Sequence, residues 1–137
     1  MSEEIATHSL LIDAPIDVVF ALLTTGEGLC AWMAVDATVD ATPDGAISWT
    51  HENGATVRGR FTSIIAPRRV AFTYGWVGNT EIPPESTVVE IDLESTNDGA
   101  TQLQLRHRLL PPEERVEHEH GWQYFTGRLA AVAPGWS

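Results

Sequence analysis

The sequence predicts an α+β fold in which one face of an antiparallel sheet of about seven strands is covered by a long C-terminal helix. Three observations predict it. Residues 35–110 alternate between apolar and polar side chains, with turn-forming residues at intervals, which is typical of antiparallel strands. Two short segments with helical spacing precede this region, and one long segment follows it. Because 137 residues suffice for one core and are too few for two, we expect a single domain over residues 1–137.

The first strand and the two short helices lie in the N-terminal part of the chain. Residues 5–12 are expected to form a strand. Pro15 suits the first turn of a helix, so a helix is predicted over roughly residues 15–24. Residues 25–28 contain two glycines and are expected to break the pattern before a second short helix over residues 29–33.

The alternating region predicts six further strands joined by short turns. They cover residues 35–40, 45–52, 55–66, 69–77, 86–95 and 100–109. Asn53-Gly54 is a strong two-residue hairpin signal, and Asn97-Asp98-Gly99 is a good three-residue one. Since strands joined by hairpins lie side by side, the simplest topology is a meander.

The parity of side chains within these strands predicts a covered face and a wet face. The covered face contains Trp49, Val57, Phe61, Ile65, Phe72, Tyr74, Trp76, Val89, Ile91, Leu93, Leu103, Leu105 and His107. The wet face contains Arg58, Arg60, Glu90, Asp92, Glu94, Arg106 and Arg108. An ion pair between Glu90 and Arg106 on adjacent strands would contribute about 0.2–1 kcal/mol.

The last predicted element is the helix that covers the sheet. Pro111-Pro112-Glu113-Glu114 opens it, with proline and acidic residues where the helix dipole favours them. The helix ends at Ala133-Pro134-Gly135. Its apolar stripe consists of Val116, Trp122, Phe125, Leu129 and Val132.

Charge and composition exclude several classes of protein. The net charge is −11, from 19 acidic residues against eight arginines, and this field disfavours nucleic-acid and membrane-surface partners. The N-terminus lacks the features of a signal peptide, and no apolar run is long enough for a membrane span, so we expect a cytoplasmic protein. Cys30 is the only cysteine, which excludes an intrachain disulfide, and it is expected to be a buried apolar residue.

Four stretches of the chain, in this order and spacing, carry a family resemblance. They are Ile12-Asp13-Ala14-Pro15 with Val18-Val19-Phe20; Leu29 with Trp32-Met33; Gly59 through Pro67 followed by Arg69-Val70-Ala71-Phe72-Thr73-Tyr74; and Thr101 through His107 before Gly121-Trp122. The chain resembles the START-like (SRPBCC) superfamily of polyketide cyclases and the birch pollen allergen. Within it, the chain is most similar to the branch related to the C-terminal domain of the activator of heat-shock-protein-90 ATPase. The resemblance implies a helix-grip fold, in which a curved sheet wraps around the long helix and a cavity between them takes hydrophobic or amphipathic small molecules.

The candidate ligand-binding residues are large side chains that either line such a cavity or fill a solid core. They are Trp32, Trp49, Phe61, Phe72, Tyr74, Trp76, His107, Trp122 and Phe125. His107 continues the inward face of its strand among leucines, so it is either a hydrogen-bonded core residue or a polar contact for a ligand. His118, four residues before Trp122, is expected at the mouth of the cavity.

The motifs of standard catalytic and cofactor sites do not occur in the sequence. It contains no Ser–His–Asp signature and no nucleotide-binding glycine loop, so we assign no catalytic residue and no cofactor. His118 and His120 are two residues apart, a spacing that does not put both on one helical face, so no metal site is assigned. The loop 78–85 is either a rim of the cavity or an ordinary connector.

These observations favour a protein that binds an apolar small molecule, without an assigned reaction. The alternative is an enzyme of the polyketide cyclase or aromatase kind, in which His107 or Tyr74 moves a proton. A second alternative is a stress-related co-chaperone or protein-interaction module, although shared fold alone does not imply that role. An exposed sheet edge also makes a homodimer a possible assembly.

Overall fold

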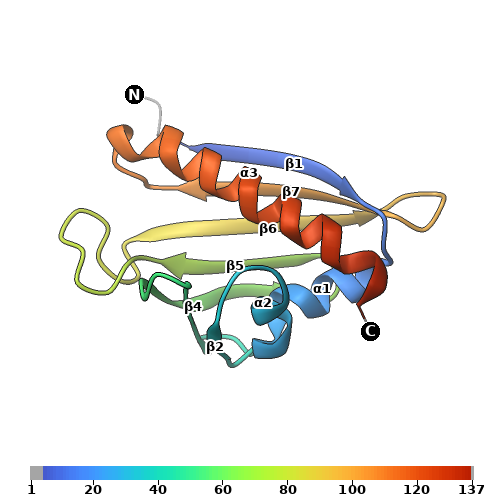
Figure 1. Cartoon of the computed structure of the whole chain (residues 1–137), viewed down its shortest axis with the longest axis horizontal. Coiled ribbons are helices and arrows are strands. Elements are labelled where there is room, and N and C mark those ends of the chain that lie inside the picture. The colour runs from blue at the N-terminus through green and yellow to red at the C-terminus, as the bar shows by residue number, and fades with distance from the viewer. Residues whose placement is uncertain (1–4, 137) are drawn as a thin grey trace.

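The computed structural model describes residues 5–136 and confirms the predicted α+β helix-grip fold (Figure 1). Within these residues a curved sheet of seven antiparallel strands faces the long helix α3. The elements, in chain order, are β1 (Ala6–Ile12), α1 (Ile16–Thr24), α2 (Gly26–Trp32), β2 (Asp36–Val39), β3 (Ala46–Thr50), β4 (Thr56–Ile65), β5 (Arg69–Tyr74), β6 (Thr87–Ser95), β7 (Thr101–Arg108), α3 (Arg115–Val132) and short 3₁₀ turns at Pro112–Glu114 and Ala133–Gly135.

The sheet has the predicted meander from β2 to β7, and β1 joins it beside β7. The strand order is β1-β7-β6-β5-β4-β3-β2. The first strand pairs antiparallel with the last, in a register that places Ala6 opposite His107 and Ile12 opposite Thr101. The N-terminal strand is thereby fixed against the segment that leads into α3.

The junction between α1 and α2 differs from the sequence prediction. Residues 25–28 do not separate the two helices by a break, because α2 already begins at Gly26. Thr25 is the reason: its hydroxyl oxygen accepts a hydrogen bond from the Gly28 amide at 2.9 Å and so caps the new helix. Gly28 also permits the close approach of the two helices, since a Cβ there would lie 2.6 Å from the carbonyl oxygen of Ala21.

Most of the predicted inward residues are covered, but Ile65 is not. The register of β4 against β5 shifts between Phe61 and Ser63, which is a β-bulge. Because the extra residue reverses the side-chain alternation beyond it, Phe61 is fully buried whereas Ile65 is 47% exposed. The prediction that Ile65 faces inward was therefore wrong.

The helix α3 runs along the covered face of the sheet and also packs against α2 (Figure 1). It buries Trp122, Thr126 and Leu129. Val116 was predicted to belong to this stripe, yet it is 50% exposed. At 3.6 residues per turn it lies about 120° around the helix from Trp122, so the prediction for Val116 was wrong.

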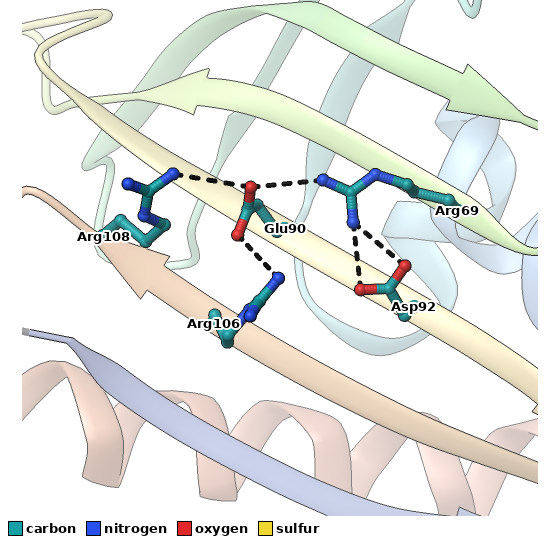
Figure 2. A network of polar contacts seen from close by, with 5 residues as sticks. All are labelled: Arg69, Glu90, Asp92, Arg106 and Arg108. Atoms are coloured by element: carbon teal, nitrogen blue, oxygen red, sulfur yellow. Dashed lines mark hydrogen bonds and ion pairs between the residues drawn. The ribbon is translucent and has the colours of Figure 1, made fainter.

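The opposite face of the sheet carries a network of ion pairs (Figure 2). Glu90 on β6 contacts Arg106 on β7 at 3.1 Å, which confirms the predicted cross-strand pair. It also contacts Arg69 on β5 at 3.2 Å and Arg108 on β7 at 3.6 Å. Arg69 in turn donates to both carboxylate oxygens of Asp92 at 3.0 Å. One carboxylate therefore joins three adjacent strands on the wet face.

Candidate ligand-binding pocket

A pocket of about 590 Å³ lies between α3, the end of α2 and the ends of β3 and β5. Four segments that are distant in the sequence form its wall. They are the end of α2 with the following residues 33–35, residues 49–53 of β3 and its hairpin, residues 74–76 at the end of β5, and one side of residues 114–128 of α3 and its preceding turn. Among the described residues, 5–136, no helix is both long and apolar enough to cross a membrane, and no group of three metal-ligating side chains is found.

Five of the predicted aromatic residues line this pocket. They are Trp49, Tyr74, Trp76, Trp122 and Phe125. Tyr74 lies at the centre of the group, with its ring centroid 5.8 Å from those of Trp49 and Trp76 and 6.1 Å from that of Trp122. Burial raises the pKa of the Tyr74 hydroxyl, and the neighbouring Trp76 side chain partly opposes this shift.

Four other predicted residues lie outside the pocket wall. Trp32 is buried, and its indole N–H donates to the carbonyl oxygen of Leu22 at 2.9 Å. Phe61 and Phe72 pack edge to face at 6.0 Å in the core of the sheet. His107 is fully buried behind Tyr74 and Trp122.

Both ring nitrogens of His107 are engaged in a buried chain of hydrogen bonds. The indole N–H of Trp122 donates to Nδ1 at 3.0 Å. Because an indole nitrogen can only donate, the proton of the neutral imidazole is on Nε2, which lies 2.8 Å from the Thr87 hydroxyl. That hydroxyl donates to the carbonyl oxygen of Tyr74 at 2.8 Å. Burial, and to a smaller extent the nearby His118, hold the pKa of His107 well below its ordinary value.

His51 is a pocket residue that was absent from the sequence-based candidates. It follows β3, and its Nε2 accepts a hydrogen bond from the Trp49 indole at 3.0 Å. Its ring centroid lies 5.4 Å from that of Trp76 and 5.0 Å from that of Phe125, and burial lowers its pKa. The sequence does contain a signal that could have identified His51. It is two residues after the inward-facing Trp49, and side chains two residues apart in a strand lie on the same face.

His118 lies on α3 at the pocket, where its spacing from Trp122 had placed it. Its Nδ1 is 2.9 Å from the carbonyl oxygen of Glu114, one turn earlier. A carbonyl oxygen can only accept, so Nδ1 carries a proton and donates it. The ring lies against Tyr74 and His107, with centroid separations of 6.1 Å and 5.4 Å.

The mouth of the pocket is polar, and Cys30 is part of it. Cys30 is exposed, so the prediction that it is buried was wrong. The short helix α2 buries Gly28, Leu29 and Trp32, and the Cys30 side chain points away from that stripe. The other polar residues of the mouth are Glu52, Asn53, Glu114, Glu117, Tyr124 and Arg128.

Comparison with known protein families finds a match to one family model. The family model described as Activator of Hsp90 ATPase homolog 1-like protein matches residues 13–133. The AHSA1-like protein RHE_CH02687 (1–152) from Rhizobium etli is similar in both sequence and structure. It is 34% identical, with a TM-score of 0.73, over 98% of this chain and 84% of that one.

Two further solved structures are similar to this chain in fold. The Aha1 dimer from Colwellia psychrerythraea is 23% identical, with a TM-score of 0.77, over 96% of this chain and 97% of that one. DynU16, a protein in the dynemicin biosynthetic locus, is 20% identical, with a TM-score of 0.83. That match covers 98% of this chain but 48% of DynU16, so this chain spans about half of its length. No curated protein matches the chain.

Proposed function

Since the chain belongs to the Activator of Hsp90 ATPase homolog 1-like family and has an aromatic pocket beside α3, we propose that this pocket binds a hydrophobic or amphipathic small molecule. The convergence of five aromatic side chains on one pocket carries this proposal. A volume of about 590 Å³ falls in the range of small-molecule sites, roughly 300–1,000 Å³. The indole and phenol groups supply apolar contact area together with a few hydrogen-bonding atoms.

The geometry gives less support to an enzyme that moves protons through His107 or Tyr74. Both nitrogens of His107 are used in the buried chain, and the residue is outside the pocket wall. Tyr74 does line the pocket, but its raised pKa makes its hydroxyl harder to ionise. The arrangement of these side chains therefore supports a binding site more than a catalytic site.

Two glycines of α3 provide a matched test of this pocket. Gly121 lines it and Gly127 does not, and a Cβ at either position would meet no atom within 4 Å. Leucine at either position should improve helix propensity by roughly 0.5–1 kcal/mol. At Gly121, however, the new side chain would occupy pocket volume.

We expect Gly121→Leu to weaken binding of the neutral dye Nile red by about tenfold or more, equivalent to about 1.4 kcal/mol. Gly127→Leu should bind the dye as the wild type does. Fluorescence titration of the three proteins, with thermal unfolding to confirm that each is folded, makes the comparison. Equal affinity in all three, or no binding by the wild type, would contradict the proposed pocket.

A further inference from the structure

Two histidine side chains of this pocket each have a ring nitrogen that is available to a ligand. Within residues 5–136, every buried side-chain nitrogen or oxygen has a hydrogen-bond partner. A ring nitrogen without a partner in that part of the chain must therefore be accessible from outside. His51 and His118 each have one such nitrogen, and both residues line the pocket.

His118 presents a hydrogen-bond acceptor. Its Nδ1 proton is donated to the Glu114 carbonyl oxygen, so in the neutral ring the lone pair is on Nε2. The side chain is half-buried beside Tyr74, which fixes the ring against the aromatic wall. A ligand hydroxyl that reaches this wall can donate to Nε2.

His51 presents the opposite group, a hydrogen-bond donor. Its Nε2 accepts from the Trp49 indole, so in the neutral ring the proton is on Nδ1. The ring is held between Trp76 and Phe125, and burial disfavours its charged form. A ligand oxygen can therefore accept from this N–H without meeting a full positive charge.

The charges at the mouth disfavour an anionic ligand. Three carboxylates, those of Glu52, Glu114 and Glu117, line the pocket against one guanidinium, that of Arg128. The Nε of Arg128 already donates to the carbonyl oxygen of Trp32 at 2.9 Å. The net charge of −11 on the whole chain adds to the repulsion.

From this juxtaposition of aromatic walls, a histidine acceptor, a histidine donor and an acidic mouth, we infer that the pocket selects an uncharged hydroxyl-bearing aromatic molecule over an aromatic carboxylate. The inference rests on the proposed function and specifies its ligand class. The hydroxyl donates to His118 Nε2, or accepts from His51 Nδ1, while the ring system packs against Trp76, Trp122 and Phe125. A carboxylate of the same shape would meet the mouth with like charge.

The test compares naphthalene, 2-naphthol and 2-naphthoate, which share one ring system. At about pH 8 a phenolic hydroxyl stays protonated and a carboxylic acid is ionised. We expect isothermal titration calorimetry to give 2-naphthol at least about tenfold tighter binding than 2-naphthoate. Naphthalene should lie between them.

Variants of α3 separate the contributions of the acceptor and of the charge. His118→Phe keeps a ring but removes Nε2, so it should weaken 2-naphthol about fivefold to tenfold and leave naphthalene unchanged. His120→Phe, at an exposed position outside the pocket, is the matched control and should change neither. Glu117→Gln should improve 2-naphthoate and leave 2-naphthol nearly unchanged.

The outcomes distinguish this inference from the proposed function. If all three compounds bind with equal affinity and Gly121→Leu abolishes binding, the proposed binding function is supported and the inferred selectivity is overturned. If 2-naphthoate binds most tightly, Arg128 dominates the mouth and the inference is again overturned. If the wild type binds none of them and does not bind Nile red, both proposals fail.

Discussion

Three histidines near the pocket differ because their ring nitrogens have different partners. His107 uses both nitrogens inside the protein, on Trp122 and Thr87. His51 and His118 each use one, on an indole N–H and a carbonyl oxygen respectively. The first is therefore part of the packing that fixes α3 to the sheet, whereas the other two keep one nitrogen each for a ligand.

At the same scale, the exposure of Cys30 predicts its reactivity. We expect N-ethylmaleimide to modify Cys30 in the folded protein without denaturant, because the thiol is exposed at the mouth of the pocket. Intact mass measurement should show one adduct, and Cys30→Ser should show none. Pre-incubation with a pocket ligand should slow the reaction. Modification that requires denaturant would contradict the exposed position.

Among the elements, the strands β5, β6 and β7 are joined on their wet face by Glu90. Its side chain is 12% exposed and is surrounded by Arg69, Arg106 and Arg108 (Figure 2). Partial burial reduces screening by water, so this carboxylate should contribute more than a surface ion pair does. Arg60 and Glu85 make such a surface pair, at 3.1 Å, with side chains 53% and 45% exposed.

We expect Glu90→Gln to lower the free energy of unfolding by about 1–3 kcal/mol, because it leaves three guanidinium groups close together without the central negative charge. Glu85→Gln is the matched control and should cost about 0–1 kcal/mol. Urea denaturation gives both values. At about 1 M salt, where the Debye length is roughly 3 Å, the deficit of Glu90→Gln should shrink. Equal effects of the two variants would refute the special role of Glu90.

For the whole molecule, the buried histidine links folding to pH. His107 has a lowered pKa in the folded state and an ordinary value near 6.5 when unfolded. Above that unfolded value neither state binds the proton, so His107 makes no pH-dependent contribution to the stability there. Between the unfolded and the folded pKa only the unfolded state binds the proton. In this range the free energy of unfolding therefore decreases as the pH is lowered.

We therefore expect the stability of the wild type to decline as pH falls below about 6.5, with a contribution from His107 of up to about 1.4 kcal/mol per pH unit. His51, whose pKa is also lowered, should add a smaller contribution of the same sign. His107→Gln should be less stable at neutral pH and show a shallower decline. Chemical denaturation at a series of pH values measures the slopes, and identical slopes would rule out this linkage.

The sequence by itself determined the order of elements, the meander and most of the covered face. Period-two alternation and Asn-Gly turns are local signals, and the family resemblance implied that a helix-grip sheet surrounds the last helix. Local signals failed where a single residue changed the geometry. The bulge after Phe61 turned Ile65 outward, and the Thr25 cap started α2 earlier than the glycines suggested.

Only the tertiary structure decided which aromatic side chains share one pocket and which nitrogens remain free in it. Trp49 and Phe72 both face inward, yet Trp49 lines the pocket and Phe72 does not, because the position of α3 and α2 over the sheet sets where the space lies. The state of a histidine likewise depends on its partners. Trp122 lies 15 residues from His107, and Thr87 lies 20 residues away, so contacts between distant segments, rather than local pattern, fixed its role.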